Sequence, residues 1–478
     1  MITVSGVRGV IGQTLTARLA LRLGEALAVL LGEQRAGADA AAPLRVAVGR
    51  DSRPSGPMIQ SAFTAGLLSA GVQVTDLGIA ATPSIALMVR FLGVDAGTVI
   101  TASHNPAEYN GLKFLGSDGR GFSSQAMGRL ASLVDNPGAL ENSPPSGAPA
   151  HSGVPGRLVA DSRSHAHHVQ SILKHVDARL IAQHRYRVVL DSINGAGCMA
   201  AAMLLGKLGV ELVHINGEAT GQFAHGPEPT GENLATLGAV VTRHRAAIGL
   251  AQDPDADRLA IIDEQGRYIG EEYTLALAVR HRLGQLGRST AAAPTIVCNL
   301  STSRMIDDLA ARFGGRVVRT PVGEAHVADA MLQTGAVIGG EGNGGVIDPR
   351  LGPVRDSFVA MALLLELLAQ TQKTVSELVA EIPAYVMLKK KFPATRQQAA
   401  EWVEQARREF AGARMDLQDG VRIDQPEGWL HVRPSNTEPL VRMIAEAADQ
   451  AAAEQLLRRV PHGPDYCITS IGGRPRRA

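Results

Sequence analysis

The chain has 478 residues, a length that predicts several domains rather than one. Hydrophobic residues make up 45% of it and aromatic residues only 4%, so its cores must consist mainly of Ala, Val, Leu and Ile. The 47 Lys and Arg residues balance 46 Asp and Glu residues, so no net charge draws nucleic acid or an anionic membrane to the protein. Any acidic ligand must therefore be held by a local arrangement of side chains.

The N-terminal residues and the cysteines carry no targeting or redox signal. ITVSGVRGV follows Met1 without a charged segment and an apolar stretch, and no run approaches the ~18 apolar residues that a membrane span needs. Cys198, Cys298 and Cys467 show neither CxxC nor metal-ligand spacing, so we expect them as buried small side chains. We expect a soluble, cytoplasmic protein with no nucleic-acid or membrane partner.

Short runs rich in Val and Ile recur three times in the same order. They lie at 45–49, 72–76 and 97–101, then at 187–191, 210–214 and 246–251, and again at 295–299, 315–319 and 336–340. Longer helical segments separate these runs, a pattern typical of βαβ units with a largely parallel sheet. The sequence therefore predicts three related α/β domains.

The limits of these domains follow from changes in composition. Residues 135–156 are dense in Pro, Gly and Ser and indicate a first linker. The last ~100 residues combine KKKF at 389–392, a strand-like WLHV at 429–432 and an Ala-rich helix expected from Met443 to Arg458, which indicates a small α+β cap ending in a solvated basic tail. We predict domains at 1–156, 157–265, 266–380 and 381–478.

A chemically unusual loop follows the third run of each domain: TASHNP at 101–106, DPDADR at 253–258 and EGNGG at 341–345. Ligands of open α/β sheets bind beyond the carboxyl ends of the strands. Three such loops and a cap imply one shared cleft. The predicted fold class is therefore α/β, with three related mixed-sheet domains and a C-terminal α+β cap around a central cleft.

DPDADR predicts a metal site. In an extended chain alternate side chains share a face, so Asp253, Asp255 and Asp257 can converge, and Pro254 favours an extended backbone. Three carboxylates repel one another unless a cation neutralises them, and their hard oxygens favour Mg²⁺ or Mn²⁺. An EF-hand is excluded because Arg258 stands where that loop requires Gly. An arginine beside a metal site suits a phosphate ligand.

TASHNP places Ser103 and His104 just beyond a buried strand. The Ser103 hydroxyl could attack phosphorus or carry phosphate, whereas the GxSxG turn of a serine hydrolase is absent. An ordinary capping serine in an Asn-Pro turn is the structural alternative. Lys113 follows shortly afterwards and could act as an acid or base near a cation or phosphate.

Two further loops indicate sugar and phosphate binding. Glu341 and Asn343 of EGNGG suit sugar hydroxyls, although a plain turn explains this loop equally well. RPSNTEP, with an arginine shortly after it, supplies guanidinium and hydroxyl donors for a phosphate, and the helix expected to follow would add its N-terminal amides. The residues of this loop are Arg433, Ser435, Asn436, Thr437 and Arg442.

These loops, in this order, resemble the α-D-phosphohexomutase family of phosphoglucomutases, phosphomannomutases and phosphoglucosamine mutases, and most of all its archaeal-type phosphoglucosamine/phosphomannomutase branch. The resemblance spans essentially the whole chain, from SGVRG at 5–9 to RPSNTEP. It implies four domains around a cleft, a phosphoserine at Ser103, and Mg²⁺ bound by the serine phosphate with Asp253, Asp255 and Asp257.

The resemblance also implies roles for the other loops. Glu341 and Asn343 match the sugar-recognition loop, the RPSNTEP loop matches the phosphate-binding loop, Arg8 faces the active serine and Lys113 is the acid/base. The implied substrate is a hexose phosphate, with hexose 1,6-bisphosphate as activator and a monomer or homodimer as the assembly. Many members have Ser where this chain has Asn343, so the preferred sugar is not carried over, and His326 receives no role.

In the expected reaction, phosphoserine 103 transfers its phosphoryl group to a hexose phosphate, which becomes a hexose bisphosphate. This intermediate turns around in the cleft and returns its other phosphate to Ser103. Glucosamine phosphate is the favoured substrate, with mannose and glucose phosphates as alternatives. A metal-dependent phosphatase is the enzymatic rival, and a cap that excludes water disfavours it. A sugar-phosphate binding protein without catalysis is the rival from another class.

Overall fold

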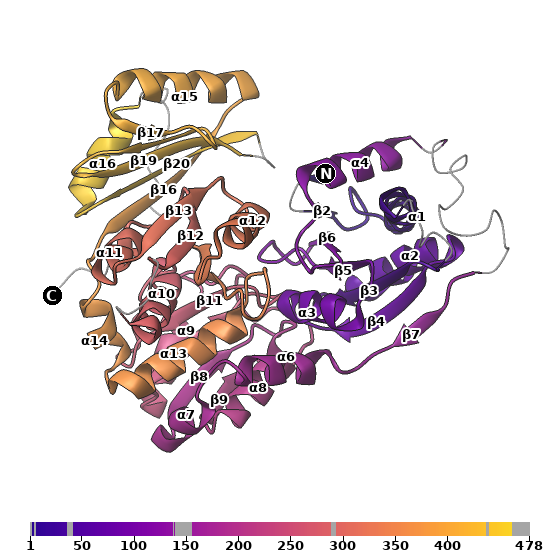
Figure 1. Cartoon of the computed structure of the whole chain (residues 1–478), viewed down its shortest axis with the longest axis horizontal. Helices are drawn as coiled ribbons and strands as arrows, with labels where there is room; N and C mark the ends of the chain where they lie inside the picture. The colour runs from indigo at the N-terminus through magenta and orange to yellow at the C-terminus, as the bar shows by residue number, and fades with distance from the viewer. Residues whose placement is uncertain are drawn as a thin grey trace.

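The computed structural model contains four β-sheets that follow one another along the chain, each covered by helices (Figure 1). It describes residues 2–3, 6–35, 42–136, 138, 155–287, 293–435 and 439–460. Asn436, Thr437 and Cys467, most of the predicted linker at 135–156 and the basic tail lie outside the described residues.

The first sheet has seven strands in the order β1-β2-β6-β5-β3-β4-β7. Its strands are β1 (Ile2–Thr3), β2 (Gly6–Val10), β3 (Arg45–Arg50), β4 (Gln73–Ile79), β5 (Ala96–Ile100), β6 (Tyr109–Gly116) and β7 (Leu158–Ala160). The helices are α1 (Ala17–Gln34), α2 (Gly56–Ser69), α3 (Thr82–Leu92) and α4 (Ser124–Asp135). Strands β3, β4, β5 and β7 run parallel, and β6 pairs antiparallel with β5.

The second and third sheets repeat the centre of the first. Their orders are β11-β10-β8-β9 and β13-β12-β14-β15, in which the last strand in chain order is antiparallel to its neighbour. The strands are β8 (Arg187–Asp191), β9 (Glu211–Ile215), β10 (Ile248–Gln252), β11 (Leu259–Ile262), β12 (Thr295–Asn299), β13 (Arg316–Thr320), β14 (Ile338–Glu341) and β15 (Gly345–Ile347). The threefold repeat and the mixed sheets predicted from the sequence are confirmed.

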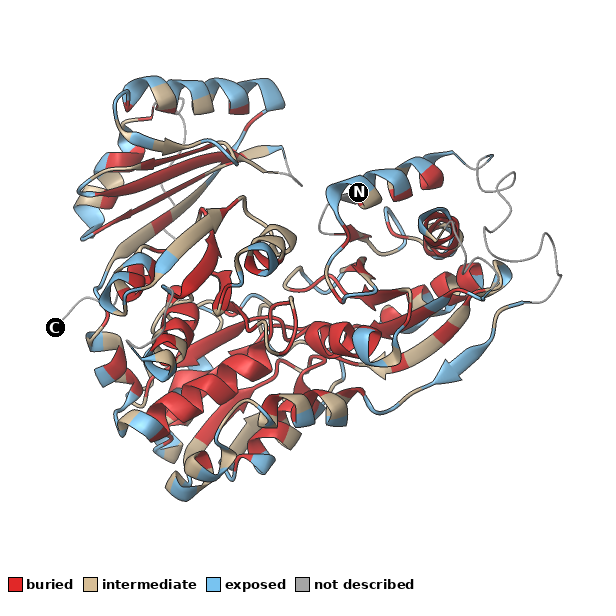
Figure 2. Cartoon of the chain, viewed as in Figure 1, coloured by how far each residue is buried: buried red, intermediate tan, exposed pale blue. Residues whose placement is uncertain are grey.

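One continuous apolar core joins the second and third sheets. The helices around these sheets are α6 (Ser164–Leu173), α7 (Ala178–His184), α8 (Cys198–Lys207), α9 (Ala235–His244), α10 (Glu272–Leu286), α11 (Met305–Arg312), α12 (Glu324–Thr334), α13 (Ser357–Thr371) and α14 (Val375–Ala380). Helix α13 is buried along nearly its whole length (Figure 2), as expected of a helix that is apolar on every side. It begins at Asp356, whose side chain accepts hydrogen bonds from the backbone N–H groups of Phe358 and Val359.

The fourth sheet is antiparallel and includes a strand that the sequence predicted as part of a helix. Its strands are β16 (Val386–Pro393), β17 (Arg414–Asp416), β18 (Val421–Asp424), β19 (Gly428–Pro434) and β20 (Leu440–Ala447), with helices α15 (Arg396–Glu409) and α16 (Gln450–Arg458). The helix expected from Met443 is wrong, because residues 440–447 pair with β16 on one side and β19 on the other. Pairing on both edges overrides the helical preference of this Ala-containing segment.

Two of the three cysteines are buried, as expected. Cys198 and Cys298 are buried free thiols, and burial raises the pKa of Cys198 to about 12, which leaves it unreactive at neutral pH. Within the described part of the chain, every helix is too short or too polar to span a bilayer.

Candidate active site

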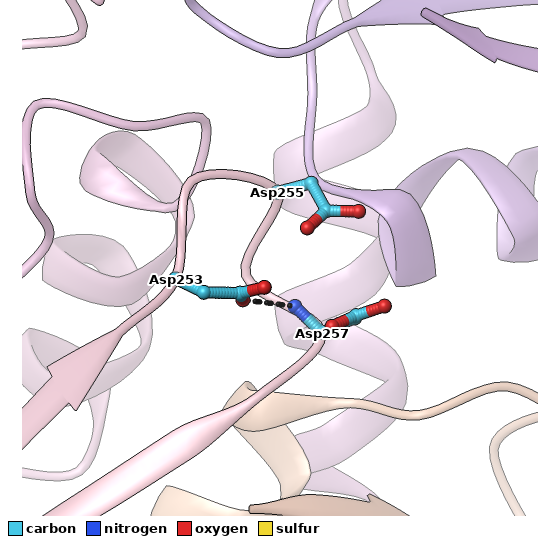
Figure 3. A group of neighbouring side chains, drawn as sticks. All are labelled: Asp253, Asp255 and Asp257. Atoms are coloured by element: carbon cyan, nitrogen blue, oxygen red, sulfur yellow. Dashed lines mark hydrogen bonds between the residues drawn. The ribbon is translucent and has the colours of Figure 1, made fainter. Parts of the chain in front are cut away.

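The DPDADR loop connects β10 to the antiparallel β11, so it leaves the carboxyl edge of the second sheet. Its three carboxylates converge as predicted, but the predicted extended backbone is wrong. Residues 254–256 form a turn, and Ala256 has a left-handed φ of 55°. The turn returns Asp257 towards Asp253, whose Oδ1 accepts a hydrogen bond from the Asp257 backbone N–H at 3.1 Å (Figure 3).

The first and third sheets supply the partners of these carboxylates. The Asp255 Oδ2 accepts hydrogen bonds from the Thr82 hydroxyl and the Lys113 ammonium, both at 2.6 Å. The Asp257 Oδ2 lies 3.2 Å from the Lys113 Nζ and 2.6 Å from the Arg355 Nη2. Lys113 comes from β6 and Arg355 from the loop before α13. Three successive sheets therefore build one site.

The three aspartates fit a hard divalent cation. One ligand oxygen from each lies within 4.8 Å of the other two, and all three side chains are buried. The Oδ1 atoms of Asp255 and Asp257 are buried without a hydrogen-bond partner. Buried carboxylate oxygens need a partner, and a Mg²⁺-sized ion with oxygen ligands would supply it. The described residues therefore form a site that could hold a metal.

The charges at this site are unequally distributed. Burial, reinforced by Asp257 and Asp255, raises the pKa of Asp253 well above its ordinary value. Burial alone would raise the pKa of Asp257 as well, but Arg355 and Lys113 hold it below its usual range. Burial alone would lower the pKa of Lys113, but Asp255 and Asp257 raise it. In the protein alone, Lys113 is therefore an ammonium.

Ser103 lies directly against the aspartates. It follows β5, is 1% exposed, and its hydroxyl donates a hydrogen bond of 2.9 Å to the Asp253 Oδ2. Its φ of 48° is left-handed, a conformation that a non-glycine residue rarely adopts. The Ser103 backbone N–H donates to the Thr101 hydroxyl oxygen at 2.8 Å, and the His104 Nδ1 lies 3.3 Å from the Ser103 Oγ.

Two arginines bring positive charge to Ser103. The Arg258 Nε is buried without a hydrogen-bond partner and lies 3.8 Å from the Asp257 Oδ1. Arg258 first, then burial and Arg8, lower the pKa of His104 well below its ordinary value, so His104 is neutral at pH 7. Arg8 extends from β2 and donates to the Asn105 Oδ1 at 2.8 Å. An anion bound beside Ser103 would offset this charge.

The third sheet places Glu341 at the end of β14, beside Asn343. The Glu341 Oε1 accepts hydrogen bonds from the Asn299 Nδ2 at 2.8 Å and the Gly323 N–H at 3.2 Å. Its Oε2 binds the Arg355 Nη1 at 2.7 Å. Both oxygens of Glu341 are thus held by the protein, whereas the Asn343 Oδ1 is buried without a hydrogen-bond partner.

The RPSNTEP loop joins β19 to β20, so it is a strand connection and does not lead into a helix. The predicted help from helix amides is therefore wrong. Arg433 and Arg442 lie directly opposite each other in the two strands. The Arg433 Nε donates to the Asp419 Oδ2 at 2.8 Å, and the Ser435 N–H donates to the Leu440 carbonyl. Asp419 also accepts from the backbone N–H of Val322, which precedes the Gly323 that binds Glu341.

Known proteins match the chain along its length. Family models described as phosphoglucomutase/phosphomannomutase domains I, II and III and the C-terminal domain match residues 2–139, 166–266, 271–385 and 389–461. A probable phosphoglucosamine mutase of Methanopyrus kandleri is 36% identical over 456 residues, with 95% of each chain covered. The chain belongs to the phosphoglucomutase/phosphomannomutase family.

Two more relatives agree with this assignment. A phosphoglucomutase/phosphomannomutase of Thermococcus kodakarensis is 37% identical over 454 residues, again with 95% of each chain covered. The crystal structure of a phosphoglucomutase/phosphomannomutase family protein from Burkholderia thailandensis superposes with a TM-score of 0.81 at 27% identity, covering 96% of this chain and 95% of that one. The four sheets correspond to domains I to IV of the family.

Two arginines of the site were missed by the sequence analysis. Arg355 binds Asp257 of domain II and Glu341 and Glu324 of domain III, and no motif marks it. Arg53 is 1% exposed, and its guanidinium group donates a hydrogen bond to the backbone carbonyl of Ser103. The segment RDSR at 50–53 follows β3 at the same sheet edge as the other loops, so the rule that located them could also have found Arg53.

Proposed function

We propose that this protein interconverts the 1- and 6-phosphates of a hexose through a phosphoserine at Ser103. One observation carries the proposal. The Ser103 hydroxyl lies 2.9 Å from Asp253, in a group of three aspartates with two oxygens that lack a hydrogen-bond partner, and the charges of Arg258 and Arg8 act on the adjacent His104. A hydroxyl between a cation site and buried guanidinium groups suits phosphoryl transfer.

In the forward half of the reaction, the bond between the Ser103 Oγ and phosphorus breaks while a hydroxyl of the hexose phosphate forms a new bond to phosphorus. Lys113 starts as an ammonium and donates the proton needed by the departing Ser103 oxygen. Neutral His104 takes the proton of the attacking sugar hydroxyl; when the serine is phosphorylated again, His104 gives a proton to the departing sugar oxygen and Lys113 takes the proton of Ser103. Mg²⁺ bound by Asp253, Asp255, Asp257 and the serine phosphate would neutralise charge on the transferred group.

Substrate binding is assigned to domains III and IV. Glu341 and Asn343 contact the sugar hydroxyls. Arg433, Arg442 and the loop between β19 and β20 form a cradle for the phosphate that does not react. The residues proposed for that cradle are Arg433, Ser435, Asn436, Thr437 and Arg442. The bisphosphate intermediate turns within the site, so the cradle must accept it in two orientations. Hexose 1,6-bisphosphate is the proposed activator that primes Ser103.

Glucosamine phosphate is the proposed substrate, because the Methanopyrus kandleri relative is named as a probable phosphoglucosamine mutase. Mannose and glucose phosphates are the alternatives, because the Thermococcus kodakarensis relative carries those names. We also retain the domain limits 1–156, 157–265, 266–380 and 381–478 and a cytoplasmic monomer or homodimer as proposals.

A coupled interconversion assay tests the function. The 1-phosphates of glucosamine, mannose and glucose are compared with Mg²⁺ and catalytic glucose 1,6-bisphosphate, and the 6-phosphate product is measured. The highest kcat/KM identifies the substrate. Release of inorganic phosphate would support a phosphatase, and tight binding of a sugar phosphate without turnover would support a binding protein.

Ser103→Ala separates the relay from other routes. It should lower kcat at least about 1,000-fold, because the phosphoryl carrier is lost. Ser171→Ala on α6, a serine bonded only to the His167 carbonyl, is the matched control. Normal turnover in Ser103→Ala would remove the phosphoserine from the mechanism.

A further inference from the structure

Arg53 is a buried cation whose guanidinium group is fully occupied by the protein. It is 1% exposed, and all five of its N–H donors are paired. The acceptors are the Asp51 Oδ2 at 3.1 Å and the backbone carbonyls of Ser103 at 2.6 Å, Asn105 at 2.6 Å, Pro106 at 2.7 Å and Tyr109 at 2.9 Å. Three of the five donors therefore bind the loop that carries Ser103, and a fourth binds the first residue of β6.

A second set of contacts supports Ser103 from the same side. The Asp51 Oδ2 also accepts a hydrogen bond of 2.6 Å from the Thr101 hydroxyl, whose oxygen in turn accepts from the Ser103 N–H at 2.8 Å. The backbone N–H and carbonyl of Ser103 are therefore both fixed from behind, by Thr101 and by Arg53. The Ser103 Oγ points the other way, to Asp253.

These contacts hold the backbone of Ser103 in an unusual conformation. The φ of Ser103, 48°, is left-handed, and a serine keeps such a conformation only where its surroundings impose it. A chain without the four carbonyl contacts would leave buried carbonyl oxygens unpaired, and Ser103 would relax towards an ordinary turn. Relaxation would rotate the Oγ away from the aspartates.

We propose that Arg53, with Asp51 and Thr101, positions Ser103 for phosphoryl transfer. In this role Arg53 contacts neither the substrate nor the metal, and it acts only through the backbone of the Ser103 loop. The inference rests on the proposed function, because it concerns the rate at which Ser103 accepts and returns a phosphoryl group. It adds a positioning residue that the comparisons and the sequence motifs did not assign.

The shape of the guanidinium group explains why the position holds an arginine. Its planar fork reaches four carbonyls at once, whereas a lysine ammonium has three donors around one point. The Arg53 Cζ also lies 5.0 Å from the centroid of the Phe223 ring of domain II. Arg53 thus also ties the Ser103 loop to the domain that carries the aspartates.

Phosphorylation of Ser103 in the full-length enzyme is the direct test. Purified dephosphorylated protein is mixed with glucose 1,6-bisphosphate and Mg²⁺, and phosphoserine 103 is followed by mass spectrometry. Arg53→Met should accept the phosphoryl group about 100-fold more slowly, because small displacements of a reacting group cost about that much. The steady-state kcat should fall similarly while KM for the hexose phosphate changes less than about threefold.

Arg422→Met is the matched control. Arg422 is equally buried, donates to the Leu300 and Thr302 carbonyls and lies 4.1 Å from the Trp429 ring centroid, but it has no contact with the Ser103 loop. It should lose comparable stability and keep the wild-type rate of Ser103 phosphorylation. Arg53→Lys should recover only part of the rate lost in Arg53→Met.

A folded Arg53→Met variant that takes phosphate at the wild-type rate would overturn the inference and leave the proposed function intact. If Arg53→Met does not fold, Thr101→Val decides, because it keeps Arg53 and removes the acceptor of the Ser103 N–H together with the hydrogen bond to Asp51. We expect it to be about 10-fold slower, and a wild-type rate would overturn the inference. Failure of the wild-type protein to accept phosphate at Ser103 would instead reject the proposed function.

Discussion

At the scale of single residues, the site is defined by carboxylates that the protein itself only partly neutralises. Lys113 and Arg355 bind one oxygen of Asp257, and Lys113 and Thr82 bind one oxygen of Asp255. The second oxygen of each remains buried and without a hydrogen-bond partner. Such an arrangement is unfavourable alone and becomes favourable when a cation is bound.

Asp255→Asn should therefore weaken Mg²⁺ binding about 10-fold or more, because it removes one ligand charge while keeping the shape of the side chain. Titration calorimetry of the unphosphorylated protein measures the dissociation constant without any turnover. Asp263→Asn is the control, since Asp263 directly follows β11 of domain II and binds Arg267 instead. Equal Mg²⁺ affinity in Asp255→Asn and wild type would place the metal elsewhere.

At the scale of elements, the β19–β20 connection presents Arg433 on rigid antiparallel strands. Asp419 holds the Arg433 Nε and also binds Val322 of domain III, so the arginine has a fixed position relative to the EGNGG loop. This is a better support for a phosphate cradle than a flexible loop would be.

Arg433→Ala should raise KM for the hexose phosphate about 10- to 100-fold, as expected for a lost charge-assisted contact to phosphate. The rate of Ser103 phosphorylation measured at saturation should change much less. Arg414→Ala, on an exposed position of β17, serves as the control. Unchanged KM in Arg433→Ala would mean that another group binds this phosphate.

The contact between domains III and IV contains a histidine that must stay neutral. His431 is fully buried, with one ring nitrogen bonded to the Asp419 carbonyl at 2.8 Å and the other to the Ser301 hydroxyl at 2.9 Å. The carbonyl can only accept, so the Nε2 carries the proton and the Nδ1 accepts from Ser301. Burial, despite the neighbouring Asp419, lowers the pKa of His431 from 6.5 to about 4.

The unfolded chain therefore binds a proton on His431 between pH 6.5 and about 4 while the folded chain does not. Stability from this group is complete above pH 6.5 and is lost as the pH falls to about 4, by roughly 3 kcal/mol. His431→Gln can keep both hydrogen bonds and does not titrate. Denaturation followed by tryptophan fluorescence at several pH values should show this extra acid sensitivity only in the wild type, and parallel profiles would contradict it.

At the scale of the whole molecule, a buried polar chain ties three domains together. The Ser84 hydroxyl on α3 is 2.8 Å from the His168 Nδ1 on α6, and the His168 Nε2 is 2.8 Å from the Asp356 Oδ2 before α13. Helices α3 and α13 begin beside the DPDADR loop. The Thr82 hydroxyl of α3 binds Asp255, and the Ser357 hydroxyl of α13 binds the Ala256 carbonyl. The junction thus holds the site between the domains.

His168→Ala should lower the free energy of unfolding by about 3 kcal/mol, because it leaves the buried Ser84 and Asp356 side chains without their shared partner. Thermal and chemical denaturation measure the loss. His167→Ala on the same helix is the control, since the His167 side chain is half-buried and packs against the Phe91 ring, with the ring centroids 4.1 Å apart. Equal stabilities of the two variants would show that the junction contributes little.

Much of this protein was determined by local sequence. The strands at 45–49, 187–191 and 295–299 formed where Val and Ile runs predicted them, because alternation of such runs with helices leaves few topologies other than a βαβ repeat. The same rule brought Ser103 and the three aspartates to one place, since the ends of parallel strands share an edge. Carboxylate and hydroxyl groups at one sheet edge then predict a site for a metal ion and a phosphoryl group.

Tertiary structure decided what has no local signal. The segment at 440–447 became a strand because two neighbours pair with it, and the turn at Ala256 rather than an extended chain brought the aspartates together. Arg53 binds backbone carbonyls 50 to 56 positions away, and Arg355 joins Asp257, 98 positions away, to Glu341 and Glu324. Sequence patterns report the preferences of neighbouring residues, whereas a buried arginine is placed by acceptors that distant parts of the chain bring to it.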